Sequence, residues 1–281
     1  MNQAKLVRTG RTVLLAVLAA LIVVPLIILF VSSLKGTRQE ILADAGSFKA
    51  FLVGDPTLQN FVDILGPKAL TPFLQYMLNS AIVLTGTVVL TLLVSTMAAF
   101  VLHRGQFRGR KLLLGVITAL YIIPGETIML PMLYECLGLG ITDSYWVQML
   151  PFVASPLFIF LFFQFFSQVP SSIGEAALID GAGPWRVFRS IYLPLNGPAL
   201  ATVAILQGMG MWNQYLWPLL STNTDGYRPI TVAIASFFGS DTILWNLAMA
   251  GSVLMMLPVL AFFLAFQRFF IASVSSSAVK G

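Results

Sequence analysis

The residues best suited to chemistry in this sequence are polar side chains that lie within long apolar segments. Polar groups at membrane depth are costly, so they are candidates for function. Amides beside aromatic rings can hydrogen-bond the hydroxyl groups of a sugar and stack on its apolar face, and Trp212 and Trp217 add rings to this set. The candidates for a solute pathway are Asn79, Glu126, Gln207, Asn213, Gln214 and Tyr215.

These residue types also have structural uses, which stay open at this point. Trp and Tyr collect at membrane interfaces, and Asn or Gln side chains tie helices together. Glu126 follows Pro124 and Gly125 directly, so we favour a role in capping a kinked helix for this carboxylate.

Catalysis by this chain is not expected. Its one cysteine, Cys136, and one histidine, His103, are too few for a disulfide framework, a zinc cluster or a Cys–His nucleophilic pair. A phosphate-binding loop would read GxxxxGK[ST], and its nearest approach, Gly105 to Lys111, has the wrong spacing. We therefore expect a protein that is not an enzyme and binds no metal or cofactor.

The composition indicates that lipid is part of the solvent of this chain. Of 281 residues, 58% are hydrophobic and 10% are charged, whereas soluble domains average roughly 25% charged residues. Apolar stretches of about 20 residues predict transmembrane helices. We predict an all-α polytopic membrane protein with one domain, residues 1–281, whose internal prolines kink helices without breaking them. The predicted spans are residues 12–33, 78–102, 112–134, 145–167, 199–220 and 246–270.

The cations predict the orientation, because cytoplasmic loops hold the excess of Lys and Arg. With the N-terminus inside, eleven of the 16 Lys and Arg residues are cytoplasmic, and both termini lie in the cytoplasm. The cations are grouped between spans without interleaved aromatic residues, so nucleic acid is not an expected partner and membrane lipid is. Outside, Leu58, Phe61 and Ile64 predict a short amphipathic helix within residues 34–77.

The connection between the fourth and fifth spans, residues 168–198, is patterned. Ser172 and Glu175 have the spacing of a capping box at the start of a short helix that ends near Ile179. Gly181 and Gly183 predict a tight turn, and Pro184 opens a second helix that Pro194 ends. Apolar residues outside the bilayer favour a docking surface, although they could also fold back on the bundle. They are Ala176, Ala177, Leu178, Ile179, Trp185 and Phe188.

At these residues the sequence resembles a known family. Glu175-Ala176-Ala177, then Gly181, Ile191 and Leu193-Pro194, is similar in residue types and spacing to the EAA loop of permeases in bacterial ABC importers. The resemblance extends to Ile123-Pro124-Gly125-Glu126, to the stretch from Trp212 to Pro218 and to the ending Ala278 to Gly281. Together these resemble the second, six-span permease of carbohydrate importers of the maltose and glycerol-3-phosphate type, with a type I importer fold.

The resemblance implies a mechanical role for the loop. In that family the loop docks on an ATPase subunit, whose closure moves the spans between inward-facing and outward-facing states. Glu175, Ala176, Ala177 and Gly181 would then couple the two proteins, with Asp180, Arg186 and Arg189 as polar contacts. The C-terminal tail, residues 271–281, would contact the ATPases through Ser275 to Gly281, or else be disordered.

The resemblance also implies the partners. These are a larger second permease, a dimer of ATPase subunits that holds ATP and Mg²⁺, and an extracytoplasmic solute-binding protein, all at the bacterial inner membrane. The outer loop, residues 221–245, would reach the binding protein through Gly226, Tyr227, Gly239 and Asp241, with a short interfacial helix from Ile230 to Phe238.

Two other readings of function stay open on the sequence. An ion-driven secondary transporter would use intramembrane carboxylates, of which Glu126 is the one available. A membrane enzyme such as a lipid transferase lacks a nucleophile and base. For the substrate, no span interior holds Lys or Arg, which favours a neutral sugar over glycerol-3-phosphate or its diesters.

Overall fold

The structure is a computed structural model that describes residues 2–66, 69, 71–239 and 243–278. Over those residues the regular structure is helical throughout, as predicted. The chain forms two compact units: one holds the residues up to Leu74 with those from Ala233 onward, and the other holds Gln75–Val232. The second unit contains most of the candidate residues.

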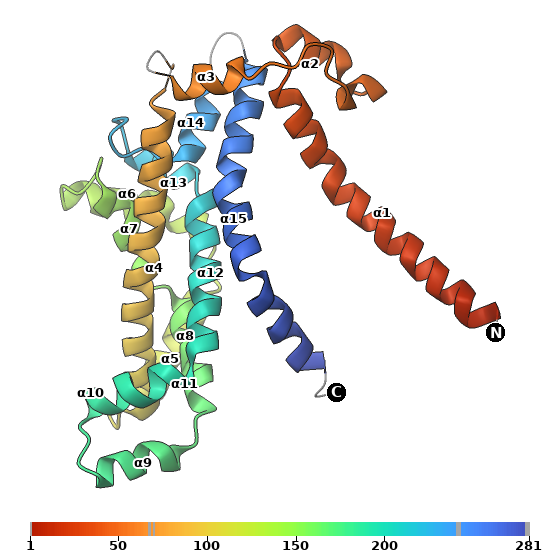
Figure 1. Ribbon diagram of the computed structural model, residues 1–281. Helices are drawn as coiled ribbons and strands as arrows, with labels where there is room; N and C mark the ends of the chain where they lie inside the picture. The colour runs from red at the N-terminus through yellow and green to blue at the C-terminus, as the bar shows by residue number, and fades with distance from the viewer. Residues whose placement is uncertain (1, 67–68, 70, 240–242, 279–281) are drawn as a thin grey trace. The chain divides into compact units, whose positions relative to one another are not determined.

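In the first unit, helix α1 contacts α15, and α3 packs on α15 (Figure 1). Asn60 of α3 fixes this end of the unit: its side-chain amide donates to the carbonyls of Ser33 and Lys35, at 2.8 Å each, and accepts from Asn246 of α15 at 2.9 Å. The amphipathic helix predicted near Phe61 is therefore confirmed. The elements of this unit are α1 (Asn2–Ser33), α2 (Arg38–Asp44), η1 (Phe48–Phe51), α3 (Gln59–Leu65) and α15 (Trp245–Ala278).

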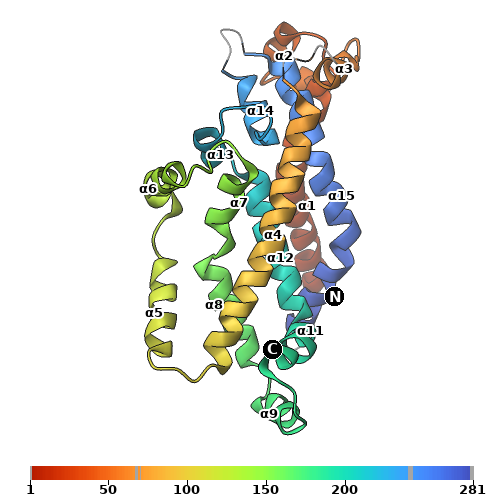
Figure 2. The ribbon, with the colours of Figure 1, turned by 90° about the vertical axis from the view of Figure 1, so that its left-hand side faces the viewer.

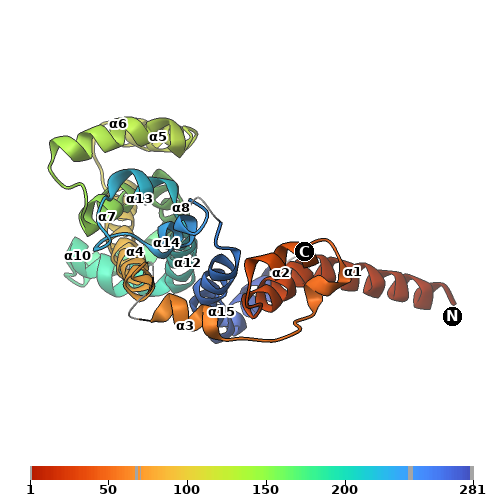
Figure 3. The same cartoon turned by 90° about the horizontal axis from the view of Figure 1, so that it is seen from above.

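In the second unit, α4 and α12 run along the long direction of the unit. Helices α7 and α8 lie beside them, and α5 lies beyond α8 (Figures 2 and 3). Helix α4 begins two residues before the unit does, and α14 ends four residues beyond it. The elements are α4 (Phe73–Arg104), α5 (Arg110–Leu120), α6 (Gly125–Gly138), α7 (Tyr145–Val153), α8 (Pro156–Ser167), α9 (Ser171–Ile179), α10 (Pro184–Val187), η2 (Phe188–Tyr192), α11 (Leu193–Leu195), α12 (Gly197–Asn213), α13 (Leu216–Ser221) and α14 (Ile230–Ser236).

Two single helices among the described residues are long and apolar enough to cross a membrane, Val7–Ser33 of α1 and Phe73–Arg104 of α4. Two bent pairs raise this number to four: α5 with α6, bent by 104°, and α7 with α8, bent by 44°. Helix α15 contributes a shorter apolar stretch, Trp245–Ala261. The six predicted segments are thus helical, while a count of six spans stays a prediction.

The third predicted span, residues 112–134, is wrong as a continuous helix. Helix α5 ends at Leu120, and Ile122 and Ile123 donate only to carbonyls three residues earlier. Pro124 adopts an extended ψ of 132° and precedes the first residue of α6. Since proline lacks an N–H and disfavours helical geometry at the residue before it, Pro124 breaks this segment. The prolines at 25, 131, 151 and 258 do lie inside helices, as predicted.

The fourth and fifth predicted spans also break, at Ser155 and at Gln214. A proline removes the N–H that would bond the carbonyl four residues earlier. Three such carbonyls accept side-chain donors from other helices instead. The Val147 carbonyl, freed by Pro151, accepts from the indole of Trp217 at 2.9 Å. The Gln214 carbonyl, freed by Pro218, accepts from the Thr231 hydroxyl at 2.7 Å.

The third freed carbonyl belongs to Phe152, four residues before Pro156. It accepts from the Thr91 hydroxyl of α4 and from the side-chain amide of Gln207 of α12, both at 3.4 Å. Side chains that satisfy freed backbone groups allow prolines in membrane helices. These bonds therefore hold α4, α7, α12 and α13 together at the breaks.

Candidate functional site

The α9–α11 segment, residues 171–195, lies at the end of the second unit where α4 ends (Figure 1). The predicted order of helix, glycine turn and helix is confirmed. The predicted capping box is wrong: Pro170, with an extended ψ of 129°, precedes the helix, and no side chain caps it. Helix α9 begins at Ser171, so Ser172 lies inside the first turn, beyond the N-cap position that a capping box requires.

The C-terminus of α9 is closed by a Schellman motif. Gly181 donates its N–H to the Leu178 carbonyl at 3.1 Å, and Ala182 donates to the Ala177 carbonyl at 2.9 Å. Gly181 has a φ of +81°, the left-handed conformation that this motif requires and that glycine adopts without steric cost. The glycine predicted as a turn residue thus sets the direction in which the chain leaves α9.

The second helix of the segment was predicted to end at Pro194, but helical structure continues through it to Leu195. A π-helical turn, Phe188–Tyr192, places the N–H of Leu193 on the Phe188 carbonyl, five residues back. Pro194 then opens the short α11. A wider turn accommodates a proline that cannot donate to the carbonyl four residues earlier. Residues 184–195 therefore form one irregular helical arm.

An aromatic anchor of Phe100, Phe166, Phe188 and Tyr192 fastens this arm to α4 and α8. The ring of Tyr192 is fully buried and lies 5.1 Å from Phe100 and 5.4 Å from Phe166, and Phe100 lies 5.2 Å from Phe188. Edge-to-face and tilted pairs at these separations are favourable. Val187, Ala199 and Val203 belong to the same buried cluster. The arm is thus a rigid extension of the bundle.

The apolar residues of the segment divide between the bundle and the outside. Ala177 and Phe188 pack against the buried cluster. By contrast, Ile179 is 87% exposed, Trp185 60% and Leu178 47%, and Ala176 is exposed as well. Part of the set therefore folds back on the bundle, and the remainder is exposed, while docking on a partner stays a prediction.

Arg104 connects α9 to the end of α4. Gly174 of α9 is buried, and a Cβ atom there would lie 3.2 Å from the guanidinium carbon of Arg104. Sequence reasoning counted Arg104 only as a cytoplasmic cation. The glycine within an otherwise good helical segment, between Ser172 and Glu175, was the available signal for a close approach.

The predicted coupling residue Glu175 and the three residues predicted to make polar contacts on this segment are available to a partner. Glu175, Asp180, Arg186 and Arg189 are exposed. Within the described part of the chain, the ion pairs are Lys35 with Asp44 and Asp225 with Arg228, so none of the four is paired.

A polar network lies at the opposite end of α4 and holds the outer loop. The Asn79 side chain donates to the Arg228 carbonyl at 3.0 Å and accepts from the Tyr145 hydroxyl at 2.7 Å. The Tyr76 hydroxyl donates to the Asp225 carboxylate. Gln148 donates to the Tyr227 carbonyl at 2.8 Å. The 25 residues from Asn79 to Arg104 place this network about 37 Å from the α9 end.

Asp143 clamps the start of this loop. One carboxylate oxygen accepts from the backbone N–H groups of Asn223 and Thr224, both at 2.9 Å, and from the Thr224 hydroxyl at 3.1 Å. Partial burial alone would raise the pKa of Asp143, but the hydrogen bonds from Thr224 and Asn223 outweigh it and hold the pKa below its ordinary value. Asp143 has a φ of 52°, and its own N–H donates to the Ser221 carbonyl.

This clamp predicts a pH-dependent loop. A carboxyl whose folded pKa is depressed contributes stability above its unfolded pKa, and that stability is lost as pH falls through the folded pKa. Amide exchange at Asn223 and Thr224, corrected for the intrinsic rate, should accelerate below about pH 4. In Asp143→Ala it should be roughly tenfold faster at neutral pH and insensitive to acid. Asp143→Asn tolerates the positive φ and serves as the control. Equal protection of the Asn223 and Thr224 amides in Asp143→Ala and in wild type would contradict the clamp.

The structure separates the predicted pathway residues. Asn79 and Gln207 are buried and hydrogen-bonded to backbone carbonyls of other segments, so both have structural roles. Glu126 is exposed in the first turn of α6, where a carboxylate interacts well with the helix dipole. Asn213, Gln214 and Tyr215 lie together at the break between α12 and α13, and Asn213 and Tyr215 are exposed.

The residues predicted to reach a binding protein are partly described. Gly226 and Tyr227 are half-buried in the outer loop, and the ring of Tyr227 lies 5.0 Å from that of Tyr145. Gly239 is exposed, whereas Asp241 lies outside the described residues. The predicted helix is confirmed as α14, which is two residues shorter at its end, while its place at the membrane interface stays a prediction. The roles of Tyr145 and Gln148 in holding this loop were not predicted. Gln148 was the available signal, because a polar side chain within an apolar segment is a candidate for function.

Residues 91–276, which include the α9–α11 segment, match a family described as the binding-protein-dependent transport system inner membrane component. The chain belongs to this family. Its relatives in the family include an arabinooligosaccharides transport system permease protein, AraQ, of Halalkalibacterium halodurans, 32% identical over 96% of this chain and 95% of the relative. The diacetylchitobiose uptake system permease protein NgcG of Streptomyces coelicolor is 32% identical over 95% of this chain and 87% of the relative.

Solved structures show the same fold. A chain of a bacterial ABC transporter involved in the import of the acidic polysaccharide alginate superimposes with a TM-score of 0.81 at 22% identity, over 96% of this chain and 98% of that one. The inner membrane component family therefore accounts for the all-helical permease fold that the sequence predicted.

Proposed function

We propose that this chain is one of two membrane-spanning subunits of an ATP-driven importer of oligosaccharides, and that the α9–α11 segment is its contact with an ATPase. The observation that carries the proposal is the combination of exposed Leu178, Ile179 and Trp185 with an arm anchored in the bundle by Tyr192. An exposed apolar patch on a rigid support is suited to transmit force from a docked partner.

In this proposal, ATP and Mg²⁺ belong to a dimer of partner ATPases, and this chain performs no chemistry. Glu175 and Ala176 on α9, Asp180 directly after it, and Arg186 and Arg189 on the arm meet the ATPase. Ala177 and Gly181 maintain the shape of the segment. Closure of the ATPase dimer favours one of two states of the bundle, because the docked segment differs in its contacts between them. A second, larger permease completes the pathway.

The opposite end of α4 supports contact with an extracytoplasmic solute-binding protein. The outer loop is held by Asn79, Gln148 and Asp143, so its exposed residues Asn223 to Asp225 are presented in a fixed position. With the N-terminus and C-terminus in the cytoplasm, this loop faces outward and α9 faces inward. Helix α4 then links the two partners directly.

For the substrate we favour an oligosaccharide over glycerol-3-phosphate. Relatives bear names for arabinooligosaccharides, diacetylchitobiose and melibiose, raffinose or stachyose. At the break between α12 and α13, Asn213 and Tyr215 are both exposed, and an amide and an aromatic ring offer the hydrogen bonding and stacking that a sugar requires.

Reconstitution tests this function. The complex that co-purifies with the chain from its host is expected to contain an ATPase, a second permease and a binding protein. In vesicles loaded with ATP, it should take up the oligosaccharide that the binding protein retains, and glycerol-3-phosphate should not enter. Vesicles that hold a proton gradient without ATP are the control. Uptake in that control, or a chain that purifies without an ATPase, would contradict the proposal.

A further inference from the structure

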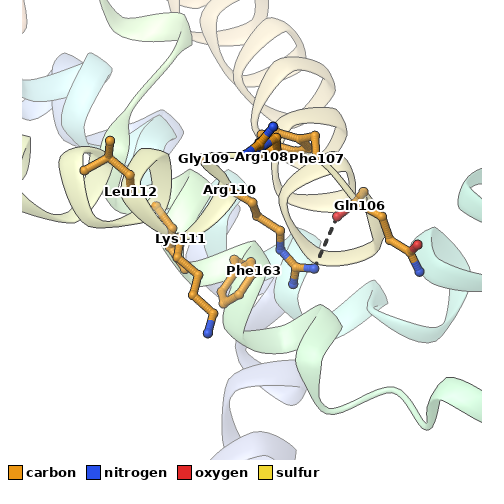
Figure 4. A pocket seen from close by; sticks show the side chains of 10 residues that line it. Gln106, Phe107, Arg108, Gly109, Arg110, Lys111, Leu112 and Phe163 are labelled. Atoms are coloured by element: carbon orange, nitrogen blue, oxygen red, sulfur yellow. Dashed lines mark hydrogen bonds between the residues drawn. The ribbon is translucent and has the colours of Figure 1, made fainter.

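The loop between α4 and α5 forms an open pocket that the transport function does not use. It has a volume of about 790 Å³, which is within the usual range for ligand sites. Figure 4 shows Arg110 and Lys111 directed to the same side as the ring of Phe163 of α8. The lining residues are Gly105, Gln106, Phe107, Arg108, Gly109, Arg110, Lys111, Leu112, Leu114 and Phe163.

The pocket is strongly positive. Arg108, Arg110 and Lys111 line it, and no Asp or Glu occurs in the sequence between His103 and Gly125. Arg110 donates to the Gly105 carbonyl at 3.3 Å, which leaves its charge uncompensated. Within the described part of the chain, none of the three cations forms an ion pair. An anionic ligand would therefore find three cations with no carboxylate to compete with it.

The same pocket continues into an apolar surface. Leu112 is 73% exposed and Leu114 also lines the pocket. None of the residues of α5, all of which the structure describes, is buried, and Val116 and Leu120 extend its exposed apolar surface. Cations beside apolar side chains at the end of a membrane helix match a phospholipid, with phosphate at the cations and acyl chains along the helix.

We propose that this pocket binds the phosphate headgroup of an anionic phospholipid in the cytoplasmic leaflet. Phosphate diester oxygens accept hydrogen bonds from Lys111, Arg108 adds positive charge from the other side of the loop, and the acyl chains lie against Leu112 and Val116. Inorganic phosphate would satisfy the cations but leave the apolar surface of α5 uncovered, so the observations favour the lipid. The site does not depend on what the chain transports.

Lipid retention tests the site in the intact importer. The complex in nanodiscs of phosphatidylcholine with phosphatidylglycerol is extracted into mild detergent, and bound lipids are counted by native mass spectrometry. Arg108→Gln with Lys111→Gln removes two exposed cations that form no hydrogen bond among the described residues. Because each cation near an anionic headgroup contributes roughly a fivefold factor, retention of phosphatidylglycerol should fall about 25-fold.

The matched control is Arg8→Gln with Arg11→Gln, which removes two exposed cations on the same predicted side of the membrane but outside the pocket. It should retain phosphatidylglycerol as wild type does. Equal losses in both double variants, or no loss in the pocket variant, would overturn the site. Displacement of the lipid by inorganic phosphate alone would overturn the lipid assignment. A photoreactive residue at Leu112 should cross-link to lipid, and cross-linking to the second permease instead would also overturn it.

Discussion

Gly181→Pro should abolish most transport while the chain still inserts and folds. Proline fixes φ near −65° and has no N–H, whereas Gly181 has a φ of +81° and donates to the Leu178 carbonyl. The lost hydrogen bond costs about 1 kcal/mol and the incompatible φ about 1–3 kcal/mol, so α9 rarely keeps the direction that docking requires. Transport by the reconstituted importer should fall at least about tenfold, a factor that needs only about 1.4 kcal/mol of this cost.

A graded series of glycine substitutions separates this effect from general damage. Gly183 has a φ of −70° and a Cβ there meets no atom within 4 Å, so Gly183→Ala should transport as wild type does. Gly181→Ala should be intermediate, since a left-handed alanine costs about 1–2 kcal/mol. The number of ATP molecules hydrolysed per sugar imported should rise from Gly183→Ala to Gly181→Ala to Gly181→Pro. Wild-type transport by Gly181→Pro, with the ATPase still bound, would remove this segment from the mechanism.

Tyr192→Ala should loosen the arm and lower the stability of the importer. The Tyr192 side chain is fully buried against Phe100, Phe166 and the ring of His103. Deletion of a buried aromatic ring costs about 3–5 kcal/mol. Thermal unfolding of the purified importer should shift down, and ATP hydrolysis should continue with poor transport because α9 is no longer held.

Tyr192→Phe is the control for that experiment. The Tyr192 hydroxyl is buried and has no hydrogen-bond partner among the described residues. A buried polar group without a partner is unfavourable, so its removal should leave stability unchanged or raise it by about 1 kcal/mol. If Tyr192→Phe proves as damaging as Tyr192→Ala, the hydroxyl rather than the ring carries the function, and the aromatic anchor is not the support that we describe.

Local signals in the sequence predicted much of the fold. Apolar segments became helices because lipid-facing backbone must bond within its own segment. The turn at Gly181 and the helix start at Pro184 were also predictable, since glycine and proline have narrow conformational roles. The capping box failed because Pro170 takes the N-cap position and the helix starts at Ser171, two residues earlier than a cap at Ser172 requires.

Contacts between distant residues were the part that the sequence could not provide. Whether a proline kinks or breaks a helix depends on where the freed carbonyl finds a donor, and Thr231 lies 17 residues from Gln214. Contacts between distant residues also decide which apolar residues of the α9–α11 segment are buried. Phe188 and Trp185 are both aromatic and close in sequence, yet Phe188 is buried and Trp185 is exposed. Packing of α4 and α8 decides between them, and no local pattern encodes that packing.

Pro151 inside α7 and Pro156 at the break between α7 and α8 have a consequence for motion. At Val147 and Phe152, the peptide oxygens are bonded by Trp217, Thr91 and Gln207 instead of by their own helix. The bend between α7 and α8 can therefore change without breaking an intrahelical hydrogen bond at either oxygen. Transporters that alternate between two openings need joints of this kind, because a bare peptide oxygen exposed to acyl chains would make every cycle slow.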